Sequence, residues 1–252
     1  MNATLSIVDY FLGHGDRALV LSQRLIECLT HAPEIEEEVA MANIALDLLG
    51  QTRTLYSRAA VLTGSDCTED DFAYWREDRA FRSPLLVEQP NGDFAQVMVR
   101  QLLHDAWALE LWSALRASSD GALAGLAAKA VPETTYHLRH SSSWVVRLGD
   151  GTDESHTRVQ RALDDLWWFT GELFECLATD AAAVASGVGV DPVSLRAPWE
   201  ARMAAILGEA RLAVPAVSYW ATGGRRGLHS EGFGRLIAEM QSVARAHPGA
   251  SW

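Results

Sequence analysis

Apolar residues recur at helical spacing along almost the whole chain, and no stretch alternates apolar and polar residues as a half-buried strand does. Five long helices are therefore expected, several of about 25 residues, well above the mean of about 11 to 12 for globular helices. Glycine, proline and acidic residues mark their ends. The expected ranges are about 4–31, with a candidate break near Gly13 and Gly15, then 33–64, 94–118, a helix that contains 133–140 and stops near 149, and 155–179.

Shorter elements separate and follow the long ones. A short helix is expected in TEDDFAYWRED, a connector in SPLLVEQPNGD, and two further helices over about 194–212 and 233–247. Long helices joined by short turns pack as antiparallel neighbours. The pattern predicts an all-α protein, a large bundle of long antiparallel helices with additional C-terminal helices, forming one domain over residues 1–252.

Composition and charge limit the class of partner. The formal net charge is -12, which argues against nucleic acid or an anionic membrane surface, because both attract clustered Lys and Arg. No run of about 18 apolar residues occurs, so no membrane span is expected. The N-terminus lacks the pattern of a secretory leader. Three widely spaced cysteines, Cys28, Cys67 and Cys176, indicate reduced thiols in a cytoplasmic protein.

The stretch ETTYHLRH, residues 133–140, is close to the Glu-x-x-His motif with which helix bundles bind two metal ions. Across the chain Asp153 is the only carboxylate residue that precedes a histidine by three residues, and it lies in a turn. Glu133 and His137 instead stand four residues apart, so they share a helix face. Zinc sites use this spacing, but no third or fourth ligand is evident. A polar pair in the core of the bundle, Glu133 with His137, is the simpler interpretation.

Several long stretches resemble one family. They are LVLSQRLIECLTHAPEIEEEVAMANIALDLLGQTR, LLVEQPNGDFA, HDAWALELW, AVPETTYHLRHSSSWVVRLGDGTD, DLWWFTGELF and TGGRRGLHSEGFGRLIAEMQ. In this order they are similar to the PaaC-type subunits of ring-1,2-phenylacetyl-CoA epoxidase, the multicomponent monooxygenase of bacterial phenylacetate degradation, in the ferritin-like superfamily. The resemblance covers essentially the chain from Leu19 to Trp252.

The resemblance implies a ferritin-like bundle that pairs with a related catalytic subunit. In that family the catalytic partner holds the di-iron centre and binds the CoA thioester, while the PaaC-type chain is its non-catalytic, stabilising partner. A small third subunit and a separate NADPH-fed reductase complete the system. The alternative is an autonomous di-iron or di-manganese carboxylate oxidase with atypical ligands.

Aligning this chain with the catalytic type implies six vestigial di-iron positions, only two of which keep a ligand of the expected kind. These positions are Gln23, Leu48, Gln51, Asp105, Thr134 and His137. Two iron ions balanced by one carboxylate would leave a large uncompensated charge in a low-dielectric core. A shift that makes Asp47 a ligand does not help, because Gly50 stands three residues later. The chain is therefore expected to bind no cofactor, and the di-iron centre is expected in the partner.

Buried polar groups must find partners. We therefore expect a hydrogen-bonded set in the vacant position, in which Asp105 pairs with His137 and raises the affinity of the imidazole for a proton.

A locally basic loop precedes the last helix. It contains Gly223, Gly224, Arg225 and Arg226. Backbone amides and arginines near a helix start bind phosphate, so contact with a CoA tail is one interpretation. An ordinary surface loop and a loop that docks on the partner subunit are the others.

Overall fold

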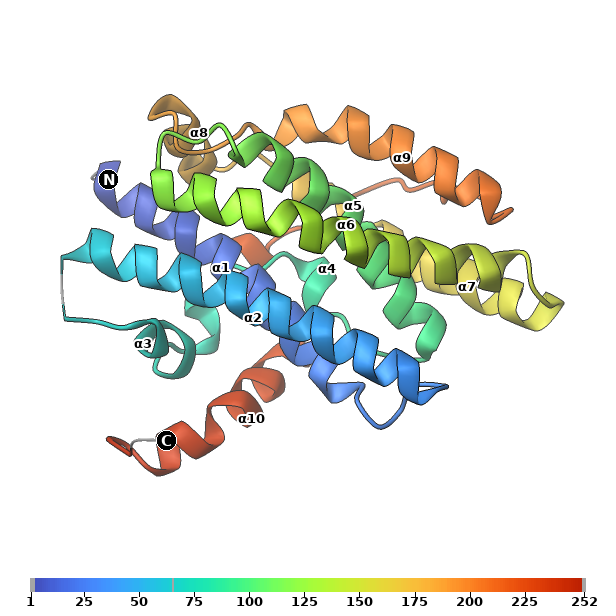
Figure 1. Ribbon diagram of the computed structural model, residues 1–252, viewed down its shortest axis with the longest axis horizontal. Coiled ribbons are helices and arrows are strands. Elements are labelled where there is room, and N and C mark those ends of the chain that lie inside the picture. Colours follow the sequence, from blue (N-terminus) through green and yellow to red (C-terminus); the bar gives the residue numbers. More distant parts are fainter. Residues whose placement is uncertain (1–2, 65, 251–252) are drawn as a thin grey trace.

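A computed structural model describes residues 3–64 and 66–250, and Figure 1 shows that these form helices joined by loops. Within these residues there are no strands, so the prediction of an all-α, ferritin-like bundle is confirmed. The four longest helices make the body of the bundle: α1 pairs with α2, and α5 pairs with α6. Their bounds are α1 Ala3–Glu27, α2 Ile35–Thr63, α5 Phe94–Leu115 and α6 Gly121–Gly149.

The remaining elements cover the flanks and ends of this body. α7 and α9 each pack on α5 and α6, and α10 packs on α3 and η1, near the described C-terminal end (Figure 1). None of the described helices is both long enough and apolar enough to cross a bilayer. These elements are α3 Glu69–Tyr74, η1 Asp78–Ala80, α4 Leu85–Glu88, α7 Asp153–Trp167, η2 Thr170–Phe174, α8 Ala178–Ala185, η3 Pro192–Leu195, α9 Arg196–Glu209, η4 Gly224–Arg226 and α10 Phe233–Ala246.

Local capping explains where the long helices begin and end. The Asp93 carboxylate accepts a hydrogen bond from the amide of Gln96, and Asp120 accepts from two amides of the first turn of α6. These bonds satisfy amides that have no partner within the helix. Gly64 ends α2 at a φ of 65°, a left-handed conformation that glycine adopts without a steric penalty. The boundaries expected from the sequence at these positions are confirmed.

The expected break near Gly13 and Gly15 is wrong, because α1 continues through both residues. The two glycines have different surroundings. A Cβ on Gly15 would lie 2.4 Å from the Tyr56 ring, whereas a Cβ on Gly13 would meet only ordinary contacts, the nearest at 3.7 Å to Cβ of Arg82. Gly15 therefore lets α2 approach α1 closely, and the Thr52 hydroxyl donates to the Gly15 carbonyl at 3.3 Å across this contact.

Two further expectations, one in each half of the chain, are corrected. The fifth long helix ends at Trp167 rather than near residue 179, and a 3-10 turn, η2, follows it. This turn places the Glu172 carboxylate in the interior, where it accepts hydrogen bonds from the amides of Leu85, Gly223 and Arg225. Those bonds favour the irregular path of the backbone after Trp167 over a continued helix. The connector near residue 85 contains one helical turn, α4.

Several of the tryptophans belong to the core. Trp112 is completely buried, while Trp107 and Trp167 are nearly so, and only Trp144 among these four is partly exposed. The Trp107 indole donates to the Leu173 carbonyl at 3.1 Å, which joins α5 to η2. A buried indole N–H usually finds such a partner, although that of Trp112 has none among the described residues.

The contact at Gly15 yields a stability prediction. Gly15→Ala should destabilise the protein by roughly 1–3 kcal/mol, because overpacking forces the buried Tyr56 ring to move. Gly13→Ala, two residues away in the same helix, should be stabilising by about 0.5–1 kcal/mol, since alanine favours helix and meets no clash. Urea unfolding followed by circular dichroism measures both. Equal effects of the two substitutions would contradict the close approach at Gly15.

Candidate functional site

A cluster of polar side chains lies in the apolar interior of the four long helices. We call it the buried polar network. Each member is at most 1% exposed, so each must find its hydrogen-bonding partners inside the protein. Its members come from α1, α5 and α6 and are Arg17, Gln101, His104, Asp105 and Ser141.

Asp105 is the acceptor at the centre of this network. Its Oδ1 accepts from the Gln101 amide at 2.6 Å and lies 3.1 Å from His104 Nδ1, and its Oδ2 accepts from the Ser141 hydroxyl at 3.1 Å. On the other side of the imidazole, Arg17 Nη1 donates to His104 Nε2. Arginine has no acceptor, so His104 Nε2 must be unprotonated and the neutral ring carries its proton on Nδ1, facing Asp105. The imidazole thus links a guanidinium to a carboxylate.

Burial dominates the electrostatics of the network. It raises the pKa of Asp105 well above the ordinary value, while hydrogen bonds from Gln101 and Ser141 and the charge on Arg17 act in the opposite direction. Burial also lowers the pKa of Arg17 to about 10, which still leaves the guanidinium charged at neutral pH. The pKa of His104 falls well below its ordinary value because of burial and the nearby Arg17.

The hydrogen-bond geometry assigns the charges of the network. Oδ1 of Asp105 faces two N–H donors, Gln101 Nε2 and His104 Nδ1, and this arrangement favours the ionised carboxylate against the opposing effect of burial. A charged Arg17, a neutral His104 and an ionised Asp105 together carry no net charge. The network is therefore compensated within this chain.

A second set of polar contacts joins α2 to α6. His137 is buried, and its Nε2 lies 3.0 Å from Oδ2 of Asp47, whose side chain is 39% exposed. One turn away, the Gln51 amide donates to Glu133 at 3.5 Å, and Lys129 lies 3.5 Å from the same carboxylate. Burial lowers the pKa of His137, with Asp47 opposing the shift.

These contacts correct two expectations about His137. It forms no hydrogen bond with Asp105, whose oxygens are occupied by donors from α5 and α6, and none with Glu133, which contacts Gln51 and Lys129. Asp47, which sequence reasoning considered and set aside, is its partner. The expected increase in proton affinity is also wrong, because burial outweighs the carboxylate.

The other positions that the resemblance aligns with metal ligands differ in burial and in hydrogen bonding. Leu48 and Thr134 are buried, Gln51 is buried with its Oε1 unpartnered, and Gln23 is half-buried with no hydrogen bond in the described structure. α1 contributes Arg17 to the interior polar network. Sequence reasoning missed both Arg17 and His104. A signal for them existed, since a lone arginine inside an apolar helical run and a histidine beside Asp105 both require buried partners.

The donor set at this position does not fit a di-iron centre. Within residues 3–64 and 66–250, no three His, Cys, Asp or Glu side chains converge as metal ligands would. The positive charge of two iron ions needs several carboxylates from four helices. Here a fixed guanidinium already lies near the central carboxylate, and a cation would be repelled by it.

The basic loop has its own internal anion. Gly223 and Gly224 are buried, and the Glu172 carboxylate accepts from the amides of Gly223 and Arg225 at 2.8 and 3.0 Å. The Arg225 guanidinium pairs with Asp180 at 2.7 Å, and Arg226 pairs with Glu175. The groups that were expected to meet a phosphate therefore bind carboxylates of this chain, and the phosphate interpretation loses its support.

The coupling between Arg17 and Asp105 is measurable. Arg17→Met should be destabilising by roughly 3 kcal/mol or more, because it leaves a buried carboxylate without its positive charge. Adding Asp105→Asn should restore at least about 1 kcal/mol of that loss, since the two effects are coupled. Urea unfolding of both single variants and the double variant gives the interaction energy, with the exposed Arg161→Met as control. Strictly additive effects would contradict a charge-compensating network.

Comparison with known proteins places the chain in a family. The sequence model of the phenylacetic acid catabolic proteins matches residues 2–252. Among similar proteins is the C subunit of 1,2-phenylacetyl-CoA epoxidase from Escherichia coli (strain K12), which is 49% identical over 246 residues, covering 98% of this chain and 99% of the relative. The match extends through all four long helices and the C-terminal segments, so the chain belongs to the phenylacetic acid catabolic protein family.

Proposed function

We propose that this protein is a non-catalytic structural subunit of a phenylacetyl-CoA epoxidase, which pairs with and stabilises a di-iron catalytic subunit. The observation that carries the proposal is the buried polar network, where Arg17 supplies a fixed positive charge near Asp105. A side-chain cation that neutralises the central carboxylate makes a metal unnecessary for stability. On this proposal the assembly also includes a small third subunit, receives electrons from a separate reductase and acts in the cytoplasm, and this chain holds no cofactor.

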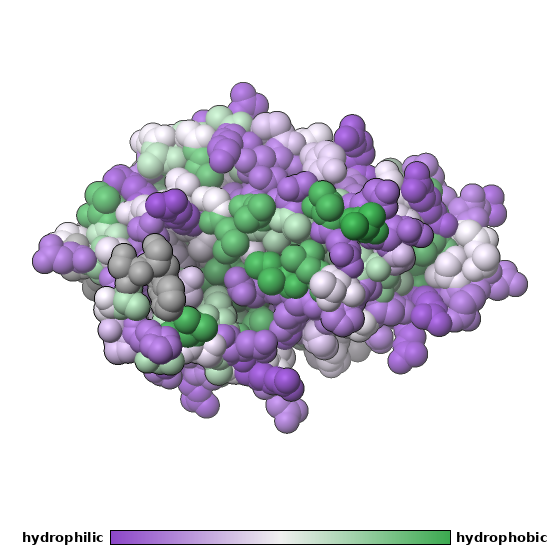
Figure 2. Space-filling model, turned by 60° about the horizontal axis from the view of Figure 1, so that its bottom comes forward, coloured by the Kyte–Doolittle hydropathy of each residue, from purple (hydrophilic) through white to green (hydrophobic). Residues whose placement is uncertain are grey.

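The outer surface of α2 supports the pairing. Ile35, Val39 and Leu46 are 71%, 57% and 64% exposed. With the partly buried Ala42 and Leu49 they repeat at alternating steps of four and three residues, the spacing with which one helix packs along another. Apolar groups also gather near the middle of the face shown in Figure 2, bordered by hydrophilic side chains. Exposed apolar surface of this kind marks an interaction site.

The resulting mechanism is indirect. A subunit that binds only the folded partner shifts the folding equilibrium of that partner toward the native state. Covering the apolar surface of α2 would remove it from water and hold the partner's helices in register. Such a subunit has no requirement for a metal, substrate or proton-transfer group of its own, which agrees with an interior whose polar groups bind one another.

Metal analysis after purification from iron-supplemented medium tests the proposal directly. The chain expressed alone should contain far less than one iron per copy, because its interior presents too few anionic ligands. Its complex with the catalytic subunit of the epoxidase should contain about two irons per heterodimer, the expectation for a di-iron centre. About two irons per copy of the isolated chain, with oxidase activity, would instead establish the autonomous oxidase with atypical ligands.

The surface of α2 gives a second test. Leu46→Lys should weaken binding to the catalytic subunit by about tenfold or more, since a charge would be buried at an apolar contact. Leu228→Lys is the matched control, because Leu228 is also 64% exposed but lies outside α2. Co-purification and biosensor titration compare the two variants with the unchanged chain. If the α2 variant binds normally, the pairing surface lies elsewhere on the molecule.

A further inference from the structure

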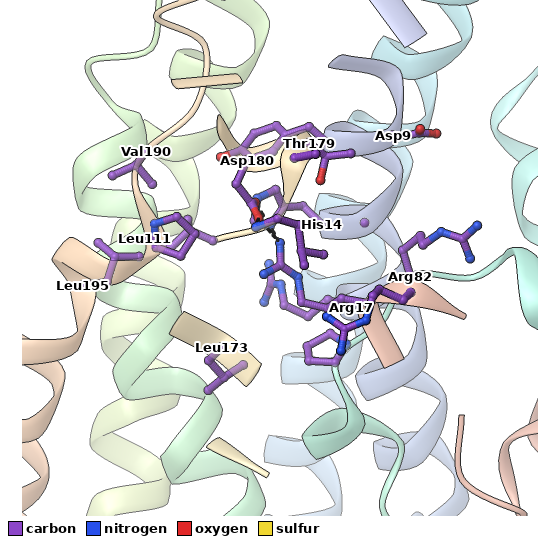
Figure 3. Close-up of a pocket in the computed structure, with 18 of the residues that line it drawn as sticks. Asp9, His14, Arg17, Arg82, Leu111, Leu173, Thr179, Asp180, Val190 and Leu195 are labelled. Carbon is purple, nitrogen blue, oxygen red and sulfur yellow. Dashed lines mark hydrogen bonds and ion pairs between the residues drawn. The ribbon is translucent and has the colours of Figure 1, made fainter. Parts of the chain in front are cut away.

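A pocket of about 380 Å³ opens between α1, α5 and the irregular segment that follows α7. Figure 3 shows it in close-up, with side chains from both helices and from residues 173–195 around it. The volume is within the range of cavities that hold small organic ligands. The buried polar network reaches it through one member, Arg17. Neither the α2 surface nor the network accounts for this cavity.

One side of the pocket is apolar. Leu111, Leu173, Val190 and Leu195 lie together on this side, away from Asp9 and Arg82 (Figure 3). Trp107 also lines the cavity. Aliphatic and indole surfaces of this kind take up an apolar group of the size of an aromatic ring, because its burial removes apolar surface from water.

The other side carries guanidinium groups with hydrogen-bond donors that no described residue accepts. Arg17 is 1% exposed and donates from Nη1 to His104, yet its Nε and Nη2 have no hydrogen-bond partner among the described residues. These two nitrogens form one edge of the guanidinium, the edge that binds a carboxylate through two parallel hydrogen bonds. A charged donor that is buried without a partner is costly, so this edge favours an anion.

A second arginine on this side is also without an ion pair in the described structure. The Arg82 guanidinium donates only to the carbonyls of Arg79 and Phe81. The remaining two arginines of the lining, Arg225 and Arg226, are neutralised by Asp180 and Glu175. The guanidinium groups of the lining that lack a direct carboxylate partner are therefore those of Arg17 and Arg82.

We propose that this pocket is a binding site for a small aromatic monocarboxylate. The ring lies against Trp107 and the leucines, and the carboxylate faces the guanidinium of Arg17, with Arg82 adding positive charge. The separation of an apolar side from a cationic side selects a molecule with one apolar end and one anionic end. The site does not depend on the proposed pairing with a catalytic subunit, and it assigns the chain a ligand of its own.

Titration of the full-length chain with phenylacetate, followed by calorimetry and by Trp fluorescence, tests the site. Saturable binding of one molecule per chain is expected, with a change in fluorescence because Trp107 lines the cavity. Phenylacetamide, which keeps the ring but not the charge, should bind about tenfold more weakly or worse, because a hydrogen-bonded ion pair is lost. Acetate, which lacks the ring, should also bind at least about tenfold more weakly for want of apolar burial.

Two substitutions distinguish the pocket from other surfaces. Gly13→Leu places a side chain in the cavity, and its Cβ meets Arg82 Cβ at an ordinary 3.7 Å, so binding should be abolished while the fold persists. Gly125→Leu is the matched control, because a Cβ there meets nothing within 4 Å and Gly125 is in α6. Arg82→Met should weaken binding several-fold, and this variant tests the pocket if Gly13→Leu does not fold.

Several outcomes overturn the proposal. These are no saturable binding of phenylacetate, equal binding of the acid and the amide, and unchanged binding in a folded Gly13→Leu or Arg82→Met variant. Tighter binding of the phenylacetyl-CoA thioester than of the free acid would also overturn it, since the site would then recognise phosphate or the thioester chain. None of these results bears on whether the chain pairs with a catalytic subunit, so the two proposals fail separately.

Discussion

The interior of the four long helices contains an acidic group, Asp105, that has been removed from water, and its neutralisation constrains everything around it. A carboxylate in this environment requires both hydrogen-bond donors and a positive charge. Gln101, His104 and Ser141 supply donors, and Arg17 supplies the charge through the imidazole. These contacts fix α1, α5 and α6 relative to one another. The compensation is covalently part of the chain and cannot dissociate.

The helical architecture follows from the sequence because apolar spacing and capping residues are local signals. The ends of α2, α5 and α6 lie where Gly64, Asp93 and Asp120 predict them. The path after Trp167 was not predictable in the same way, because it depends on the contact of Glu172 with amides more than fifty residues later. Gly15 shows the same limit, since a glycine that permits close helix packing cannot be told from a helix break without its neighbour Tyr56.

In the candidate site, too, residue types could be predicted from the sequence, whereas contacts between residues on different helices could not. The non-ligand residue types of Leu48 and Thr134 are visible in the sequence, and the structure places both side chains in the interior. The partners of His137 and Asp105 were not predictable, because each choice depends on the relative rotation of two helices about their axes. Asp47 rather than Asp105 faces His137. Arg17 belongs to α1, the helix on which sequence reasoning had considered only Gln23. It links the interior network to the pocket that α1 and α5 line.

The two carboxylates that hold the C-terminal loop also bear on how the chain folds during synthesis. Glu172 is fully buried and binds amides of residues 223 and 225, and the buried Glu88 accepts from the Ser230 amide at 2.6 Å and lies 2.7 Å from His229 Nδ1. Until residues 223–230 have left the ribosome, the Glu88 carboxylate lacks its partners and Glu172 keeps only the Leu85 amide, so their burial is costly. The region between α4 and η2 must then stay hydrated while the helices N-terminal to it are already complete. Closure of the interior is thus tied to the synthesis of residues 223–230, and a chain truncated before them would be left with an open, water-filled flank.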